Sequence, residues 1–337
     1  MISVVIPTRN RAQLLQKTLD SLTMCGAQNI EFEVIVVDNN STDDTEKISL
    51  LYSRRFDNFR YIKEKVPGLH SGRHAGLLES KGNILAYLDD DAEVEKDWLI
   101  GINESFQDDT LMLLGGNNYP NWHTSPPIWL KIMWEDAKQK VGYLGPLSII
   151  DSDFSINMNP RLVFGCNFII RKSALLEIGG FHPDALPEEL LVFRGDGETY
   201  VSEKIIERDW KVKFDQRVSI YHAVTKERMT AKYFRKRAFS QGVSHSYSDL
   251  RKNKENTFLA SILSNIKTLT RYYLRFLIQV LKNPRKSTWQ IELIRIQSFI
   301  ATKRGYRWHQ LQYRKSERVR RWVHRDNYFD TLEILER

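Results

Sequence analysis

The chain has 337 residues, of which 42% are hydrophobic and 27% are charged, a composition that excludes a disordered or fibrous protein. This length allows one large α/β domain with an appendage, or two modest domains. The two cysteines, Cys25 and Cys166, lie far apart in the sequence, which argues against a disulfide scaffold and fits a reducing compartment.

Charge divides the chain into two unequal parts. The first 225 residues hold 24 Lys and Arg against 33 Asp and Glu, whereas the chain from Lys226 onward holds 26 against 9. We therefore predict a mildly acidic domain at 1–225 and a basic helical region at 226–337. Such a region suits nucleic acid, an anionic membrane surface or an anionic substrate, and a solvated helix face is the plainer alternative.

No stretch of the sequence predicts export or a membrane span. Met1 leads directly into the apolar run from Ile2 to Ile6, which is not the pattern of a secretory signal. Nor does any segment offer 18 apolar residues free of charge. We therefore expect a cytoplasmic protein.

Strands and helices are predicted to alternate through the first 90 residues. Short apolar and β-branched runs predict buried strands at 2–7, 32–37, 59–62 and 84–88. Helices are expected between them, the first capped by Asn10, the second by Thr42 or Asp43, and the third over 74–80. This alternation predicts an α/β fold whose sheet is mostly parallel and covered by helices on both faces.

The later part of the chain predicts a long irregular segment and then helices. Prolines and tryptophans cluster between 119 and 161, which favours a lid or a substrate loop. Further strands are predicted at 163–170 and 218–221, with a helix from about 195 to 208 between them. From residue 230 the sequence is helical and basic, with apolar helices at 258–281 and 289–300 that could form a hairpin.

Polar side chains follow the first, second and fourth predicted strands where each strand ends. They are Thr8, Arg9, Asn10, Asp38, Asn40, Asp89, Asp90 and Asp91. Carboxyl ends of parallel strands meet at one edge of a sheet, and ligands bind there. Three carboxylates suit a phosphate-bearing ligand only with a hard divalent cation such as Mg²⁺ or Mn²⁺ between them. We expect Asp91 to lie in an exposed turn.

Dinucleotide-binding and P-loop enzymes are disfavoured by the same strand ends. No Gly-x-Gly-x-x-Gly follows the first strand, and no Gly-Lys-Ser/Thr loop occurs in the chain. Those enzymes need glycines to bring backbone N–H groups close to phosphate.

The chain resembles family-2 glycosyltransferases with the GT-A fold over about residues 2–229. The resemblance rests on an ordered set of segments: Val4-Val-Ile-Pro-Thr-Arg-Asn10, Val34-Ile-Val-Val-Asp-Asn-Asn-Ser-Thr-Asp43, Gly68-Leu-His-Ser-Gly-Arg-His-Ala-Gly76, Leu85-Ala-Tyr-Leu-Asp-Asp-Asp-Ala92, Trp98-Leu99, Gly179-Gly-Phe181 and Gly195-Asp-Gly-Glu198. It implies an inverting transferase that uses Mn²⁺ or Mg²⁺ and moves a sugar from a nucleoside-diphosphate sugar to a hydroxyl of a glycan or lipid-linked glycan. It also implies a catalytic domain at 1–225, with a nucleotide-sugar half at about 1–118 and an acceptor-side half at about 119–225.

The resemblance also implies roles for individual residues. Donor binding falls to Pro7, Thr8, Arg9, Asp38, Asn40, Arg73, Asp89, Asp90, Asn167 and Arg228. Asp91 would bind the metal, and His222, just after the predicted strand at 218–221, would complete the metal shell or touch the diphosphate. An imidazole ligand suits Mn²⁺ better than Mg²⁺. Trp122 and Trp129 would stack on the acceptor sugar or anchor their loop.

Glu198 is the general base that the resemblance implies. In relatives a Glu-Asp pair opens the acceptor-side helix, and its Asp deprotonates the acceptor hydroxyl. Here Gly197 and Glu198 take those two positions, so the carboxylate is one methylene longer. Asp196 is the competing base, and a helix N-terminal charge with no catalytic role is the third hypothesis.

Two other functions are weighed beside this one: a nucleotidyltransferase on a similar sheet, and a catalytically silent nucleotide-sugar-binding module. A processive synthase is disfavoured because Arg307-Trp308 follows Arg304, where that class has Gln. We expect no nucleic-acid partner. For the basic region we weigh a peripheral contact with anionic lipid at the inner face of the membrane, packing within the molecule, and a homodimer interface.

Overall fold

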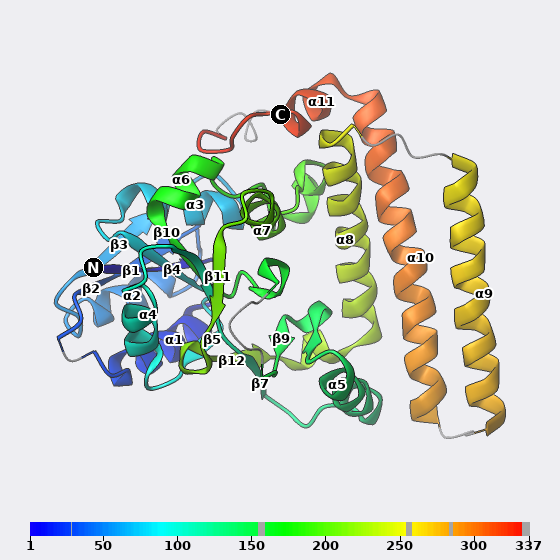
Figure 1. Ribbon diagram of the computed structural model, residues 1–337, viewed down its shortest axis with the longest axis horizontal. Helices are drawn as coiled ribbons and strands as arrows, with labels where there is room; N and C mark the ends of the chain where they lie inside the picture. The colour runs from blue at the N-terminus through cyan, green and yellow to red at the C-terminus, as the bar shows by residue number, and fades with distance from the viewer. Residues whose placement is uncertain (28, 154–158, 254–257, 283–285, 332–337) are drawn as a thin grey trace.

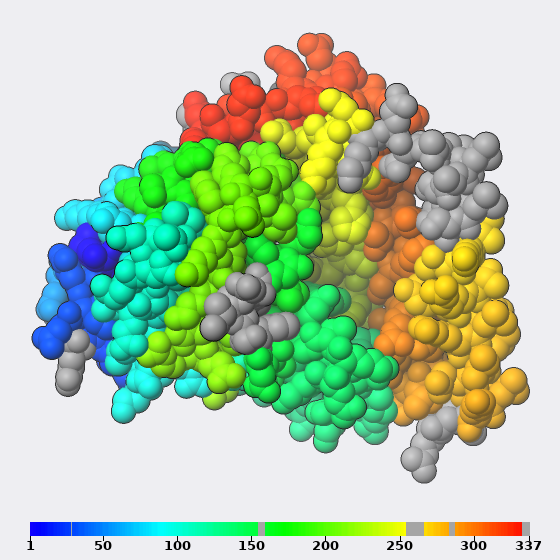
Figure 2. Space-filling view, viewed as in Figure 1, coloured from blue at the N-terminus to red at the C-terminus, as the bar shows by residue number. Residues whose placement is uncertain are grey.

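Two β-sheets and a helical array make up the molecule. The computed structural model describes residues 1–337 except 28, 154–158, 254–257, 283–285 and 332–337. Figure 1 shows the larger sheet with helices on both faces, and Figure 2 shows the C-terminal helices filling one end of the molecule.

The larger sheet has seven strands in the order β11-β6-β10-β4-β1-β2-β3. Their bounds are β1 Ile2–Thr8, β2 Phe32–Asp38, β3 Phe59–Lys63, β4 Ile84–Leu88, β6 Leu111–Gly115, β10 Asn167–Arg171 and β11 Lys211–Phe214. Only β10 runs against the others, because it is antiparallel to both β4 and β6. The mostly parallel sheet predicted from the sequence is therefore confirmed.

Two hydrophobic clusters cover the two faces of this sheet. One holds α1 (Ala12–Met24), α2 (Thr45–Tyr52) and α4 (Trp98–Ser105), and the other holds α3 (Leu69–Glu79), α6 (Lys172–Ile178) and α7 (Glu198–Glu207). Strand side chains point alternately to the two clusters, as Val4 and Val5 of β1 do. Burial on both faces explains why these strands read as continuous apolar runs.

The smaller sheet has five strands in the order β5-β12-β7-β9-β8. Their bounds are β5 Ala92–Val94, β7 Asn118–Trp122, β8 Tyr143–Leu144, β9 Ile149–Ile150 and β12 Ile220–Val224, and α5 (Ile128–Lys140) lies between β7 and β8. Short 3₁₀ turns join the remaining elements: Gly145–Leu147, Pro160–Leu162, Glu188–Phe193, Gln216–Val218 and Lys226–Met229. Strand β4 ends at Leu88 and β5 begins at Ala92, so the acidic turn lies where the two sheets meet.

Four helices follow the sheets: α8 (Ala231–Arg251), α9 (Phe258–Lys282), α10 (Lys286–Lys315) and α11 (Glu317–Val323). Helices α8 and α10 pack closely because each presents a glycine to the other. A Cβ added at Gly242 would lie 1.9 Å from the Thr302 carbonyl oxygen, and one at Gly305 would lie 2.1 Å from the Phe239 carbonyl oxygen. Helix α9 packs against α10, which confirms the predicted hairpin. Within the described residues no helix has the length and apolarity needed to cross a membrane.

The segment after α11 returns to helix α3 on the larger sheet. The Tyr328 carbonyl oxygen accepts a hydrogen bond from His74 Nδ1 at 2.9 Å, and the Tyr328 hydroxyl donates to the Trp322 carbonyl oxygen at 2.5 Å. His74 Nε2 in turn accepts from the Phe181 backbone N–H at 2.8 Å. His74, on α3, is therefore bonded to two segments that follow it by more than 100 residues.

Several predicted element bounds differ from the structure. Helix α3 begins at Leu69 and not at residue 74, and β10 begins at Asn167 because the 3₁₀ turn Pro160–Leu162 precedes it. Within the segment predicted to be irregular, Ile128–Lys140 forms a helix of 13 residues. Pro127 immediately before this helix is a common helix-start residue, and Trp129 and Trp134 are buried within the helix.

The prediction that Asn10 caps the first helix is wrong. Asn10 adopts a left-handed conformation with φ of 53°, and its side-chain oxygen accepts from the Thr42 backbone N–H at 2.7 Å. The first free N–H of α1, on Ala12, instead donates to the Asp43 carboxylate at 3.0 Å.

Candidate functional site

A cavity of about 640 Å³ lies at the carboxyl ends of β1 and β4, between the two sheets and α8. It brings together ten of the residues predicted for the site: Pro7, Thr8, Arg9, Arg73, Asp89, Asp90, Asp91, Glu198, His222 and Arg228. Asp38, Asn40, Asn167, Asp196, Trp122 and Trp129 are outside its lining. Segments separated by up to 220 residues thus converge on one space, as the strand-end argument anticipates.

Asp90 and Asp91 are buried, so the expectation that Asp91 lies in an exposed turn is wrong. Asp90 accepts hydrogen bonds from Thr8 Oγ1 at 2.8 Å and from Arg11 Nη1 at 2.9 Å. Burial nevertheless raises the pKa of Asp90 to about 7, because it outweighs the attraction of Arg11. The turn is covered because the side chain of Arg11 lies across it.

Asp91 is surrounded by cationic and imidazole groups. One carboxylate oxygen lies 3.0 Å from Arg11 Nη1 and 3.3 Å from Arg228 Nη1, and the other lies 3.3 Å from His222 Nε2. Burial alone would raise the pKa of Asp91, but His222, Arg11 and Arg228 together hold that pKa below its usual range. Asp91 Oδ1 is buried and has no hydrogen-bond partner among the described residues. An ionised carboxylate with an unsatisfied oxygen is suited to a cation.

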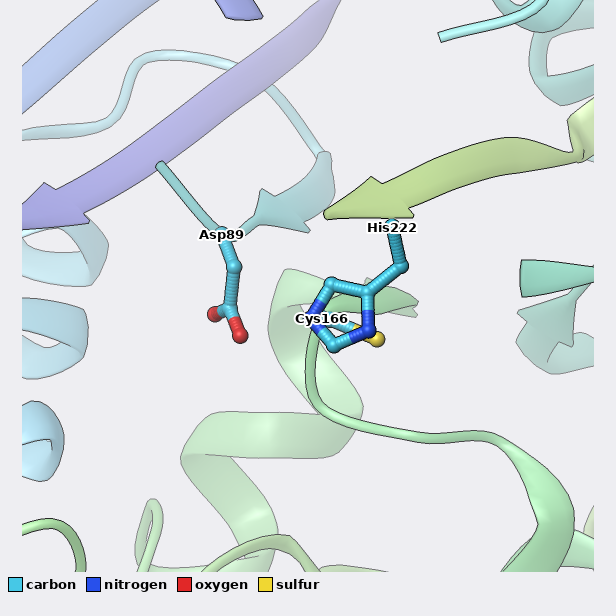
Figure 3. Close-up of side chains that lie close together, drawn as sticks. All are labelled: Asp89, Cys166 and His222. Atoms are coloured by element: carbon cyan, nitrogen blue, oxygen red, sulfur yellow. The ribbon is translucent and has the colours of Figure 1, made fainter. Parts of the chain in front are cut away.

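Asp89, Cys166 and His222 form a group that could hold a metal ion. One ligand atom from each lies within 4.8 Å of the others, and Figure 3 shows the three side chains reaching one space from the turn after β4, from the loop before β10 and from β12. Burial raises the pKa of the Cys166 thiol well above its usual value, which keeps it protonated and makes it a poor ligand. The oxygen and nitrogen groups of Asp89, Asp91 and His222 therefore fit Mn²⁺ or Mg²⁺ better than a thiophilic metal does.

His222 is oriented by its second ring nitrogen. It lies within β12, not after a strand as predicted, and its Nδ1 donates to the Leu147 carbonyl oxygen at 3.1 Å. That bond assigns a proton to Nδ1, so Nε2 is the ring nitrogen that faces Asp91 and could bind a cation there. A carbonyl partner of this kind is the usual second-shell support of a metal-binding histidine.

Arg73 connects the acidic turn to the predicted base. Its guanidinium is buried, donates to the Gly165 carbonyl oxygen at 2.8 Å and lies 3.7 Å from both Asp89 and Glu198. It also lies over the ring of Phe181, 5.0 Å from the ring centroid. One fixed cation thus holds two carboxylates at the floor of the cavity.

Glu198 is the first residue of α7, and its carboxylate lines the cavity. Gly197 before it has a φ of 56°, and a Cβ there would lie 2.9 Å from Asp184 Oδ2. The missing side chain at 197, where relatives have an acid, is therefore explained by a left-handed backbone beside another carboxylate.

Asp196 is engaged away from the cavity. Its carboxylate accepts hydrogen bonds from His182 Nδ1 at 2.6 Å and from Ser248 Oγ at 2.5 Å. Burial would raise the pKa of Asp196, but His182 and these hydrogen bonds lower it. These hydrogen bonds and the lowered pKa favour a structural role for Asp196, which joins the start of α7 to α8.

Several predicted residues are held in other contacts. Asp38 accepts from the Ser41 N–H at 2.7 Å and from the Tyr61 hydroxyl at 2.6 Å, and Asn167 bonds Trp98 Nε1 and the Val218 carbonyl. Asn40 is exposed in a left-handed turn with φ of 61°. Trp129 is 6% exposed and packs edge-on against Phe234, in a cluster that Trp122 also contacts. The structure thus brings neither tryptophan to the cavity.

Residues for which the sequence predicts no role also line the cavity. Arg11, Asn39, Asp184 and Arg237 are among them. Asn39 follows the predicted strand 32–37 by two positions and Arg11 follows the strand 2–7 by four, and this closeness to strand ends is a signal that points to both. Arg237 lies on α8, 39 positions after Glu198, and no sequence pattern marks it.

This fold is that of a glycosyltransferase. A sequence model described as "Glycosyl transferase family 2" matches residues 3–179, and the chain belongs to that family. A second, structural comparison finds the same fold in a mannosyltransferase of Pyrobaculum calidifontis, which was solved with GDP-Man and Mn²⁺. It aligns with a TM-score of 0.61 at 17% identity, over 91% of this chain and 87% of that one.

Curated relatives match over shorter stretches. Glycosyltransferase AglE of Haloferax volcanii is 35% identical over 128 residues, which is 37% of this chain and 42% of AglE. A GalNAc(5)-diNAcBac-PP-undecaprenol beta-1,3-glucosyltransferase of Campylobacter jejuni is 34% identical over 98 residues, 28% of this chain and 30% of that protein. The chain thus matches less than half the length of either relative.

Proposed function

We propose that the chain transfers a sugar from a nucleoside-diphosphate sugar to an acceptor hydroxyl, with a divalent cation and with inversion at the anomeric carbon. The observation that carries this proposal is the position of Glu198 between two cavities. A second cavity of about 400 Å³ shares Ser148, Glu198 and Arg237 with the first. A base that faces a donor space and an acceptor space at once is what a direct displacement needs.

The first cavity is the proposed donor site. Asp89, Asp91 and His222 would hold Mn²⁺ or Mg²⁺, which would neutralise charge on the leaving nucleoside diphosphate. Arg228 lies 3.3 Å from Asp91, close enough for its guanidinium to contact a phosphate oxygen of the donor. The remaining predicted donor contacts, Pro7, Thr8 and Arg9, lie at the end of β1 and line the same space.

The second cavity is the proposed acceptor site, and it lies between helices α8 and α10 and the segments 145–148, 161–164 and 198–202. Side chains with hydroxyl, amide, guanidinium and aromatic groups line it: Arg161, Phe164, Ser202, Phe234, Gln241, Ser298 and Thr302. Such a mixture suits a sugar, whose hydroxyls bind polar groups while its ring faces contact aromatic rings. Glu198 would take the acceptor proton as the hydroxyl oxygen attacks, and Arg73 would keep the carboxylate in position.

The acceptor we propose is a glycan or a lipid-linked glycan, used at the cytoplasmic face of the membrane. The name of the C. jejuni relative describes a lipid-linked acceptor, which supports this class without identifying the acceptor here.

The test is donor turnover with a set of nucleotide sugars. The chain is incubated with Mn²⁺ and UDP-, GDP- or dTDP-sugars, and the released nucleotide is identified. Release of nucleoside diphosphate, lost on chelation, is expected. Release of pyrophosphate would indicate nucleotidyl transfer, and no turnover of any donor would favour a silent binding module. A thermal shift with each nucleotide identifies the base, since only a ligand of the native state raises Tm.

A further inference from the structure

Helix α9 exposes a continuous apolar surface. Seven of its large hydrophobic side chains are 37–83% exposed, and Leu281 is the most exposed of them. The seven are Ile266, Tyr273, Leu274, Leu277, Ile278, Val280 and Leu281. At 100° per residue, all but Val280 fall within an arc of about 140°. A contiguous exposed apolar surface of this kind marks a binding surface.

The opposite side of α9 packs against α10. Tyr272 meets Phe299 edge-on at 5.9 Å, and Phe276 meets Trp289 at 6.2 Å. Figure 1 shows α9 at the edge of the molecule, with α8 and α10 between it and the catalytic sheet. The apolar arc is therefore an outer surface, left over after the helix has packed within its own chain.

Charge along α9 has one sign. The helix carries Lys267, Arg271, Arg275 and Lys282 and has no Asp or Glu. These four cations lie along one border of the apolar arc, within about 80° of one another. Arg275 also lines a cleft that holds Asp136 and Glu292, so Lys267 and Arg271 are the cations that face outward most clearly.

We infer that α9 is a membrane-surface helix that binds anionic lipid, with its apolar arc in the headgroup region and its cations among the lipid phosphates. An amphipathic helix with a basic border has this preference. A second copy of the chain fits less well, because its α9 would bring four more cations and no carboxylate to the same contact.

The inferred surface lies one helix behind the proposed acceptor cavity. Ser298 and Thr302 of α10 line that cavity, and the adjacent Phe299 contacts α9. Packed helices lie about 8–10 Å apart, so a lipid-linked acceptor held in the bilayer would have a short path to the cavity. This link rests on the proposed function, whereas the lipid contact does not.

Flotation with vesicles tests the inference. The chain is mixed with vesicles of phosphatidylcholine alone and with vesicles that also contain anionic phosphatidylglycerol, whose negative surface attracts basic segments. We expect flotation with the anionic vesicles at low salt and its loss at high salt. Lys267→Gln with Arg271→Gln should weaken the partition by about 30-fold, at about 1 kcal/mol for each cation.

A matched pair of variants separates the apolar arc from general surface effects. Leu274→Glu with Leu281→Glu changes leucines of α9 that are 53% and 83% exposed, and should abolish flotation. Leu50→Glu with Leu51→Glu changes α2 leucines that are 52% and 60% exposed, and should not alter it.

Three results would overturn the inference. They are recovery in the soluble fraction at low salt, equal flotation with neutral vesicles, and a dimer in sedimentation that only the α9 variants dissociate. Donor hydrolysis in detergent-free buffer is measured alongside and should be the same in all variants. Its absence would contradict the proposed function and leave the flotation result standing.

Discussion

The Glu198 carboxylate lines the cavity, whereas the carboxylate of Asp196 is bonded to His182 and Ser248. We predict that Glu198→Gln lowers sugar transfer by about 10²–10⁴-fold, because the amide keeps the shape and cannot accept a proton. Nucleotide binding should be unchanged, since the first cavity keeps its acidic turn. Transfer kinetics and nucleotide titration on the same sample measure the two quantities.

Asp196→Asn is the control for that experiment. Asp196 bonds His182 and Ser248, so its variant should lower the melting temperature and retain most of the turnover per folded molecule. If Asp196→Asn loses transfer and Glu198→Gln keeps it, the base is assigned to the wrong carboxylate.

Asp91 is suited to a cation, and its loss should appear in metal binding. We predict that Asp91→Asn weakens Mn²⁺-dependent nucleotide binding by more than about 100-fold, the upper effect seen for an outer-shell partner alone. Asn is preferable to Ala because Asp91 is buried and faces two guanidinium groups. Calorimetric titration of nucleotide with Mn²⁺ and with chelator, on the unaltered chain and on the variant, measures the effect. A variant that binds nucleotide in Mn²⁺ as tightly as the unaltered chain would contradict the prediction.

The sequence predicted the site residues that directly follow a strand, because the end of the strand fixes where their side chains lie. Asp89 to Asp91 follow β4 directly, so their place was determined by one buried apolar run. Asn167 and Trp129 were not predictable in this way, because their partners Trp98 and Phe234 lie 69 and about 100 positions away and only the tertiary packing selects them. Arg11 was missed because a loop arginine is ordinary in sequence.

Close contact between α8 and α10 depends on two glycines. We predict that Gly242→Ala and Gly305→Ala each lower the free energy of unfolding by about 1–3 kcal/mol, because the new methyl group would overlap a carbonyl oxygen of the other helix. In an exposed helix the same change would stabilise by about 1 kcal/mol. Urea unfolding of each variant shows whether its free energy of unfolding falls or rises.

Gly145→Ala provides the comparison for these two variants. A Cβ at Gly145 would have no atom within 4 Å, so stability should change little. Stabilisation by Ala at 242 or 305 would show that the two helices are further apart than described.

Element prediction succeeded where burial is uniform along the element. Strands β1, β2 and β4 are buried on both faces, and their apolar runs set their bounds to within a residue or two. Helix α5 was missed because its apolar residues serve a cluster built with α8 and α10, so its own first turn, after two prolines, does not resemble an isolated amphipathic helix. The strand that holds His222 was shifted because the 3₁₀ turn Gln216–Val218 takes the start of the predicted run.

Acid should destabilise the whole molecule through its buried histidines. Burial lowers the pKa of His74 and of His309 to about 4, against an unfolded value of about 6.5. Between these values the unfolded chain binds protons that the folded chain excludes, so stability is full above pH 6.5 and falls as the pH drops toward 4. From pH 7.5 to 5.0 we expect a loss of about 2 kcal/mol for each histidine.

Urea unfolding at pH 7.5 and 5.0 measures that loss. His245 is exposed by comparison, so His245→Gln should change the difference much less than replacement of His74 or His309. A free energy of unfolding that is the same at both pH values would contradict neutral burial of His74 and His309.

The bond between His74 and Tyr328 has a consequence for synthesis. The two residues are 254 positions apart, so at about 5–20 residues per second a ribosome reaches Tyr328 roughly 13 to 50 seconds after His74. During that interval the N–H of the imidazole lacks its native acceptor, and the side of α3 that Tyr328 and Phe329 cover stays open to water and to other nascent chains. The side of α3 around His74 is thus covered only after the segment that holds Tyr328 and Phe329 has been made, long after the last strand of the larger sheet.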